Sequence, residues 1–338
     1  MKGREYMVEY RKARAEEAED ILDFINYVFS QAHNPHDFKQ FNPGMYASGY
    51  PFWKEHYVAV ENGRIKATLS ITRKEFERAG MKFISGHVGQ VSVHPYARGA
   101  GHMKKLMRMA DEDMQADGWD FSELNGLRQR YEYFGYTQGD CRVRLTITPT
   151  NVRHALGGQE SGYRAEKRPD GRLWESLWDV YDENGKYVGV AGNGTMRIED
   201  FSIAPKVCDA FFKYSGEKSM TLSYPLYETE RIRAVNAFCE EIAYKTGMQY
   251  KVYHFERVIQ AGLTLRAQAG LLQDGEMTIE IDGNPIRIAV KDSAVTVEKG
   301  EAGKGRKLTA MQAQEMIFST ASGVLYPEAP VGWFPISL

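Results

Sequence analysis

Cysteine is scarce in this chain. Its 338 residues contain three cysteines, Cys141, Cys208 and Cys239, which are far apart and odd in number. This pattern offers neither a disulfide framework nor the ligand spacing of a cysteine-rich metal site. We therefore expect a cytoplasmic protein with buried thiols and no bound metal.

Long apolar runs and an excess of positive charge are also missing. No segment approaches the roughly 20 apolar residues that span a membrane, and no apolar signal segment follows the first five residues, MKGRE. The formal net charge is −2, whereas a general nucleic-acid binder carries a basic surplus. We expect neither a membrane nor a nucleic acid as a partner.

The length exceeds that of one ordinary domain, which predicts two or three domains. In the first part of the chain, strand and helix signals alternate, and Glu61-Asn62-Gly63 predicts a tight hairpin. Strands are predicted over residues 7–12, 56–60, 64–72, 88–93, 120–124 and 142–147. Helices are predicted over residues 15–29 and 127–134, and a third helix runs from the glycine turn described in the next paragraph to about residue 116.

The most informative stretch covers residues 91–107. A short apolar strand is followed by the glycine-bearing turn Arg98-Gly99-Ala100-Gly101 and by an amphipathic helix. Such a turn points several backbone N–H groups at one place beside the positive end of a helix, an arrangement that binds phosphate. Glycine allows close backbone approach, and Arg98 can add charge-assisted hydrogen bonds. A plain glycine turn before a helix is the alternative interpretation.

This stretch resembles the coenzyme A loop of the GNAT superfamily of N-acetyltransferases, whose pattern is Gln/Arg-x-x-Gly-x-Gly/Ala after a strand. Arg98 and Gly101 fit, and Met103 stands where the family usually has Gly or Ala. Residues 130–136 resemble the family's late helix-to-strand corner, often Tyr-x-x-Phe-Gly-Tyr. The resemblance implies an α/β (α+β) fold, in which residues 1–148 form a catalytic GNAT domain with a mixed, mostly antiparallel sheet.

The rest of the chain also resembles known domains. Residues 149–254 partly echo the first block and suggest a degenerate GNAT-like domain, with a long helix predicted over 228–245 and a strand over 248–254. Ile203-Ala204-Pro205-Lys206 replaces the glycine turn there, so we expect no pyrophosphate site. Residues 255–338 resemble a small sterol-carrier-protein-like α+β domain. This succession is similar to the enhanced-intracellular-survival (Eis) type of acetyltransferase, which also implies a homo-oligomer.

The resemblance implies acetyl-CoA as a co-substrate. The strand at residues 91–93 would pair with pantetheine, and a backbone N–H near Val93 would stabilise the oxyanion. Tyr131 matches the family's tyrosine near the thioester sulfur and would protonate the leaving thiolate, with a packed structural tyrosine as the alternative. His102 can equally pack, and Lys104 can equally lie on a solvated helix face. The residues expected at the cofactor are Val91, Ser92, Val93, Arg98, Gly99, Ala100, Gly101, His102, Met103 and Lys104.

Two groups are candidates for the general base. In Eis-type proteins the C-terminal carboxylate reaches the active site, so the resemblance implies Leu338. His87 is the alternative, because alternation along its strand predicts a shared face with Gly89, Val91 and Val93, and histidine suits proton transfer near neutral pH. Either group can be purely structural.

The aromatic-rich residues 32–53 are expected to form a long loop or a broken helix. Their rings could grip a cationic amine or fill space between domains.

These observations favour an acetyl-CoA-dependent N-acetyltransferase acting on a primary amine of an aminoglycoside-like compound, a polyamine, or a lysine or peptide. No Ser/Cys–His–Asp signature is visible, so we expect direct attack in a ternary complex. The alternative is a non-catalytic protein that binds or senses acyl-CoA or a lipid. Met103 and the sterol-carrier-like end keep that alternative open.

Overall fold

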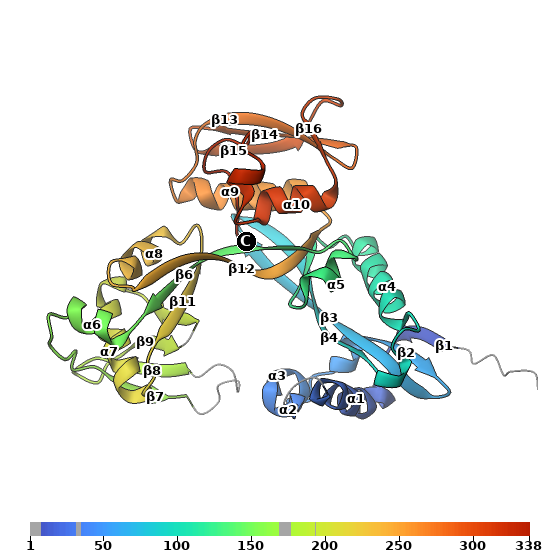
Figure 1. The fold of residues 1–338 in the computed structure, drawn as a ribbon, viewed down its shortest axis with the longest axis horizontal. Helices are drawn as coiled ribbons and strands as arrows, with labels where there is room; N and C mark the ends of the chain where they lie inside the picture. The colour runs from blue at the N-terminus through green and yellow to red at the C-terminus, as the bar shows by residue number, and fades with distance from the viewer. Residues whose placement is uncertain (1–7, 32–34, 169–176, 193) are drawn as a thin grey trace, which may run out of the picture.

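The computed structural model describes residues 8–31, 35–168, 177–192 and 194–338. Three sheets organise these residues (Figure 1). The largest has eight strands in the order β1-β2-β3-β4-β5-β12-β6-β11, and all neighbours are antiparallel except β4 and β5. The predicted mixed, mostly antiparallel sheet is therefore confirmed. Its strands are β1 (Val8–Lys12), β2 (His56–Glu61), β3 (Arg64–Arg78), β4 (Met81–Val93), β5 (Phe121–Leu124), β6 (Thr137–Ile147), β11 (Met220–Pro225) and β12 (Glu241–Val252).

Helices cover both faces of the first half of this sheet (Figure 1). On one face, α1 (Ala18–Ser30) buries Ile21 and Ile25 against Val58 of β2. On the other face, α4 (His102–Ala116) buries Leu106 against Leu69 of β3. The aromatic-rich segment is a broken helix, as one of the two interpretations predicts, with α2 (Phe38–Phe41), α3 (Pro43–Tyr46) and the 3-10 turn η2 (Phe52–Glu55).

The predicted hairpin joins β2 and β3, with Asn62 and Gly63 at φ of 52° and 70°. A second hairpin escaped prediction, because β3 and β4 extend well beyond the expected ranges and meet at Ala79-Gly80. Its tip carries apolar side chains such as Phe76 that pack in the core of the C-terminal part. Burial against a distant part of the chain thus stabilises strand residues whose local pattern is weak.

The helix predicted over residues 228–245 is wrong in its second half. Helix α8 covers only Thr229–Asn236, and β12 begins at Glu241. β12 fills the space between β5 and β6, so that Tyr250 faces both Glu123 and Thr137. Without β12, the backbone groups along the inner edges of β5 and β6 would lack partners, and this pairing outweighs local helix propensity.

Two smaller sheets complete the fold. The second has the order β10-β9-β8-β7 and the third the order β15-β14-β13-β16, in which only β13 and β16 are parallel. Their elements are α6 (Pro149–Ala155), β7 (Arg164–Lys167), β8 (Leu177–Tyr181), β9 (Tyr187–Gly192), β10 (Thr195–Ile198) and α7 (Ala204–Ser215), then α9 (Phe255–Gln268), β13 (Gly275–Ile281), β14 (Asn284–Lys291), β15 (Ala294–Lys299), β16 (Arg306–Leu308), α10 (Ala310–Phe318) and α11 (Ser322–Leu325).

The C-terminal tail is docked at the centre of the molecule, where the parts meet (Figure 1). Trp333 is fully buried. Buried Arg266 of α9 donates to the carbonyl oxygens of Gly332 and Pro335, at 2.6 and 3.0 Å. The hydroxyl of Ser337 donates to the carbonyl of Cys141 on β6 at 2.6 Å. Apolar burial and these hydrogen bonds fix the last residues against the large sheet.

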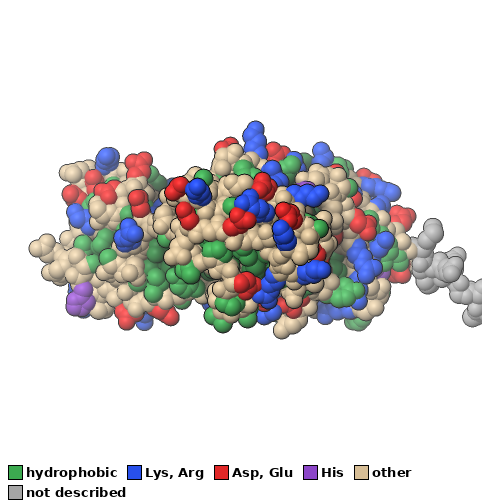
Figure 2. Space-filling view, turned by 90° about the horizontal axis from the view of Figure 1, so that it is seen from above, with side chains coloured by type: hydrophobic (Ala, Val, Ile, Leu, Met, Phe, Trp, Pro, Cys, Tyr) green, Lys and Arg blue, Asp and Glu red, His purple; other side chains and the backbone are tan. Residues whose placement is uncertain are grey.

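Acidic and basic side chains are interspersed on the face seen from above (Figure 2). Within the described part of the chain, no helix combines the length and apolarity required to cross a membrane.

Buried His56 should make stability pH-dependent. Its Nδ1 lies 2.9 Å from Oγ1 of Thr68. Because the Thr68 hydroxyl donates its own proton to the carbonyl of Tyr57, Nδ1 of His56 donates to Oγ1, and Nε2 carries the lone pair. Burial lowers the pKa of His56 from 6.5 to about 3. The unfolded chain therefore binds a proton that the folded chain excludes, and stability falls as pH drops below 6.5. We expect a slope of about 1.4 kcal/mol per pH unit between these values.

Denaturant unfolding at pH 7 and pH 5 checks this expectation. The non-titrating variant His56→Asn should show a smaller loss of unfolding free energy between the two pH values than the wild-type protein. Equal losses in the two proteins would contradict it.

Candidate active site

The large sheet opens into a fork at the end of β5. The parallel pairing of β4 with β5 stops at Val88 and Leu124, and β4 continues to Val93 while paired only with β3. Among the described residues, no strand pairs with residues 89–93 on the side that β5 has left. This part of β4 thus presents free backbone groups to an extended ligand.

A β-bulge lies at the mouth of the fork. Thr68 pairs with Ser92 and Ser70 with Gly89, so Gln90 and Val91 together oppose one residue of β3, and Gln90 has a φ of 46°. The bulge shifts the alternation by one residue. Val91 and Val93 consequently pack on the α4 side with Val88, and the predicted face that they share with His87 is wrong. Ser92 is buried on the opposite face, and its hydroxyl has no partner among the described residues.

The glycine turn leads directly into α4. Gly99 and Gly101 have φ of 87° and 82°, which glycine adopts without strain, and a Cβ at either position would meet only open space. Gly101 is the N-cap of α4, and no side chain caps the helix. Arg98 and Ala100 are exposed beside it. The turn therefore leaves the first N–H groups of a 15-residue helix accessible, beside an exposed guanidinium.

The helix residues after the turn take different directions. His102 is buried, with Nδ1 2.8 Å from the hydroxyl of Tyr10, so it packs under β1. Met103 is half-buried on the core below α4, which directs its bulk away from the turn. Lys104 places its ammonium 4.4 Å from the ring centre of Tyr133, where it forms a cation–π contact at the surface.

Tyr131 lies on the other wall of the fork. It is buried on the short helix α5 (Arg128–Glu132) that follows β5. Its ring packs closely against the chain at Gly126, where a Cβ would come within 2.3 Å of it. Burial raises the pKa of Tyr131, an effect that the neighbouring charge of Arg130 partly offsets. The hydroxyl therefore keeps its proton at neutral pH.

Gln249 is a residue of this wall that sequence reasoning missed. It lies on β12 opposite Leu124, is 4% exposed, and donates from Nε2 to the carbonyl of Gly126 at 2.8 Å. Its Oε1 is buried without a partner among the described residues. No signal in the sequence connects Gln249 with Tyr131, because the connection depends on the insertion of β12 beside β5.

His87 lies one residue before the fork, beside Glu123 of β5. Nδ1 of His87 is 3.5 Å from Oε1 of Glu123, and that carboxylate also pairs with Lys74 at 2.5 Å. A Cβ on Gly89 would lie 3.7 and 4.0 Å from Cδ2 and Nε2 of His87. Nδ1 is thus within ion-pair distance of a carboxylate but has no hydrogen-bond partner among the described residues, and the Cδ2–Nε2 edge of the ring lies beside Gly89, where the fork begins. An imidazole next to a carboxylate is suited to the role of a general base.

Glu123 was not predicted from the sequence, and it is the charged centre of this site. Burial alone would raise its pKa, but the His87 ring and the Lys74 ammonium outweigh burial and hold the pKa of Glu123 below its usual range. A second carboxylate, Glu55, accepts a hydrogen bond from Thr72 at 2.6 Å, and Thr72 is the cross-strand neighbour of His87. Carboxylates therefore lie on both sides of His87.

Leu338 packs in a different apolar cluster from Tyr131. Its side chain packs on the apolar cluster that contains Phe121 and Tyr250, and the residue lines a cavity with Arg142 and Tyr227. The structure brings the tail to β6, on the side of the sheet where Glu123 lies, and no cation of the described residues is within ion-pair distance of the terminal carboxylate.

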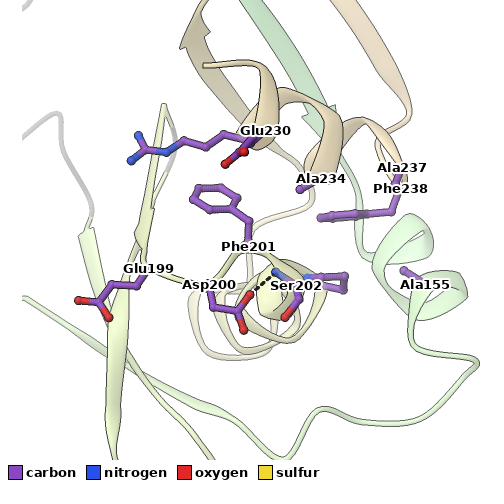
Figure 3. A pocket seen from close by; sticks show the side chains of 11 residues that line it. Ala155, Glu199, Asp200, Phe201, Ser202, Glu230, Ala234, Ala237 and Phe238 are labelled. Atoms are coloured by element: carbon purple, nitrogen blue, oxygen red, sulfur yellow. Dashed lines mark hydrogen bonds between the residues drawn. The ribbon is translucent and has the colours of Figure 1, made fainter. Parts of the chain in front are cut away.

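A pocket in the second half of the chain lies before α7 (Figure 3). Asp200 accepts a hydrogen bond from the N–H of Ser202 at 2.8 Å, and Phe201 lies between this turn and Glu230. Pro205 supplies no N–H in the first turn of α7. Three carboxylates, of Glu199, Asp200 and Glu230, and one guanidinium, of Arg231, line the pocket, so its net negative charge disfavours a phosphate.

A family model identifies the first part of the chain. Residues 9–139 match the model described as acetyltransferase (GNAT) domain. This part of the chain is thus similar to acetyltransferase (GNAT) domains. This domain contains the fork, the glycine turn, His87 and Tyr131, whereas Gln249 and Leu338 come from outside it. A search of curated proteins finds no match to the chain.

Solved structures share the fold over almost the whole chain. A GCN5-related N-acetyltransferase from Anabaena variabilis superimposes with a TM-score of 0.63 at 14% identity, covering 94% of this chain and 92% of that one. A probable N-acyltransferase from Enterococcus faecalis superimposes with a TM-score of 0.61 at 14% identity, covering 96% of this chain and 94% of that one. Eis1 from Mycobacterium abscessus superimposes with a TM-score of 0.56 at 10% identity, covering 91% of this chain and 89% of that one. The GNAT domain of this chain is thus embedded in a larger architecture that other proteins also possess.

Proposed function

We propose that the protein transfers an acetyl group from acetyl-CoA to a primary amine by direct attack within a ternary complex. The observation that carries this proposal is the fork between β4 and β5, with a glycine turn at one end and the His87–Glu123 pair at its mouth. The free edge of residues 89–93 fits the amide groups of pantetheine. The open space over Gly99 and Gly101 fits a pyrophosphate beside the N-terminus of α4.

Each candidate residue then has a chemical task. Nε2 of His87 takes a proton from the amine, and the Glu123 carboxylate orients the ring and stabilises its protonated form. The amine nitrogen attacks the thioester carbonyl, and a backbone N–H near Val93 stabilises the oxyanion. The C–S bond breaks, and Tyr131 donates its proton to the leaving thiolate. Gln249 holds the chain at Gly126, against which the Tyr131 ring is packed, and acts as a positioning residue.

Release of free thiol from acetyl-CoA tests the proposal. The purified protein would be incubated with aminoglycosides, polyamines, ω-amino acids and lysine peptides. Amine-dependent release establishes the transferase and identifies the acceptor class. Tight binding of acetyl-CoA without release for any amine would overturn the proposal and favour an acyl-CoA-binding protein.

Removal of Leu338 distinguishes the two predicted bases. If His87 is the base, deleting Leu338 or extending the chain by two glycines should change kcat by less than about tenfold, well below the 100-fold or more that losing a general base costs. A larger loss in both variants, with acetyl-CoA binding intact, would assign the base to the terminal carboxylate instead.

We further infer that the C-terminal part is a sterol-carrier-like domain, a proposal that the four-stranded third sheet packed on α9 supports. The limits 1–148, 149–254 and 255–338, the amine classes and a homo-oligomer stay predictions. Acetylation assays and measurement of the molecular mass in solution address them.

A further inference from the structure

A second cavity of about 1110 Å³ lies beside the proposed acceptor side of the sheet. The tip of the β3–β4 hairpin, strands β6, β9, β10 and β11, and the C-terminal residue line it. Its charged side chains are five cations and three carboxylates: Arg78, Arg142, Lys186, Arg197 and Arg231, with Glu199, Asp200 and Glu228. Its volume is slightly above the range of about 300–1,000 Å³ that is usual for small-molecule sites.

Two of the carboxylates in this cavity are already engaged. Glu228 pairs with Arg231 at 2.8 Å, and Asp200 accepts the N–H of Ser202. By contrast, Lys186 and Arg197 form no ion pair with any described residue. The cavity therefore offers cations that an incoming anion can engage, although Glu199 and the terminal carboxylate also line it.

Two buried polar atoms in the lining lack partners within the described part of the chain. The hydroxyl of Tyr224 is one, on a side chain that is only 4% exposed, and Nε of Arg78 is the other. A buried donor without a partner costs free energy unless a ligand or water satisfies it. An O–H and an N–H donor in the same lining as cations without an ion pair suit carboxylate or phosphate oxygens.

A chain of charged groups connects this cavity with the proposed site of proton transfer. Arg142 lines the cavity, donates to the carbonyl of Ser223 at 2.9 Å and lies 3.6 Å from Asp140. Asp140 lies on β6, which β12 joins to β5 through Tyr250, the partner of both Glu123 and Thr137. Burial raises the pKa of Asp140, Arg142 opposes this effect, and the negative charge of Glu123 adds to it. The acidic surroundings of His87 and the cationic cavity are thus adjacent regions of opposite charge.

We propose that this cavity binds an anionic group of the acceptor, so that the substrate is an amine that also carries a carboxylate or phosphate. The inference rests on the proposed function, because it assumes that the amine is acetylated at His87. The amine would lie among the carboxylates around His87, and the anionic end would reach the donors and cations of the cavity. A polycation, by contrast, would face Lys186 and Arg197 at its far end.

Pairs of acceptors that have the same size and shape but differ in charge test the proposal. Each ω-amino acid from three to eight carbons would be compared with its primary amide, which has the same size and the same amine but no charge. We expect at least one acid to exceed its amide about tenfold in kcat/KM, the equivalent of about 1.4 kcal/mol of differential binding. Arg197→Gln should reduce that ratio toward one. Arg233→Gln, which changes an exposed arginine of α8 that does not line the cavity, should leave the ratio unchanged.

A binding measurement separates failure of this inference from failure of the proposed function. Inorganic phosphate would be titrated by calorimetry with acetyl-CoA at saturation, so that the glycine turn is already filled. Weaker phosphate binding by Arg197→Gln and by Tyr224→Phe, but not by Arg233→Gln, supports the anion site even if no amine is acetylated. Equal kcat/KM for acids and amides, or equal phosphate affinity in all variants, overturns the inference while acetyl transfer itself can stand.

Discussion

Replacing His87 with alanine should lower kcat/KM for the amine by about 100-fold or more, the usual cost of removing a general base. The His87 imidazole has Nδ1 beside Glu123 and Nε2 beside Gly89, where the fork begins. Binding of acetyl-CoA should change little, because His87 lies on the opposite face of the sheet from α4. Thiol release and calorimetric binding of acetyl-CoA check both expectations.

Two companion variants define what the His87 result means. Glu123→Gln keeps the imidazole but removes the neighbouring negative charge, so we expect a smaller loss of kcat than in His87→Ala. His154→Ala, at an exposed position on α6, should behave like the wild-type protein. A His87→Ala protein with near wild-type kcat/KM would remove the imidazole from the mechanism.

Tyr131→Phe should lower kcat by about 100-fold while the KM for acetyl-CoA stays within about threefold. The substitution removes only the hydroxyl. The ring keeps its packing against Gly126 and its edge-to-face contact with Tyr136, whose ring centre is 6.4 Å from that of Tyr131. The folded structure should therefore be preserved. Because burial raises the pKa of Tyr131, the wild-type hydroxyl is protonated at neutral pH and can donate as the thiolate leaves. Initial rates and calorimetric binding of acetyl-CoA check the prediction.

Tyr133→Phe is the matched control for this variant. Tyr133 lies two residues away, is 55% exposed and contacts Lys104 at the surface. Its replacement should leave kcat unchanged. If both tyrosine variants lose kcat equally, or if neither does, Tyr131 is not the proton donor.

The local features of the first part of the chain were predictable from the sequence. Asn62-Gly63 specifies a hairpin through its left-handed conformations, and the glycine turn before α4 follows from residue types alone. The α/β architecture with its mixed sheet was also predictable. Each of these features depends on a few neighbouring residues and on known patterns.

Features that depend on distant pairing were not predictable in the same way. Residues 241–245 read as a helix, and only the unfilled space between β5 and β6 turns them into a strand. Glu123 became visible as a site residue only when the parallel register placed it opposite His87. The bulge at Gln90 reversed the predicted direction of Val91 and Val93, because a single extra residue shifts every side chain that follows.

The position of β12 has a consequence for biosynthesis. A ribosome releases the fork, the glycine turn and Tyr131 long before it releases residues 241–252, which complete the sheet beside β5. Until then, β5 and β6 have exposed edges that other chains can join, the hazard of an unpaired strand. The nascent acetyltransferase domain therefore reaches its final form only after most of the chain has emerged. During that interval, the exposed edges of β5 and β6 must be kept from pairing with other chains.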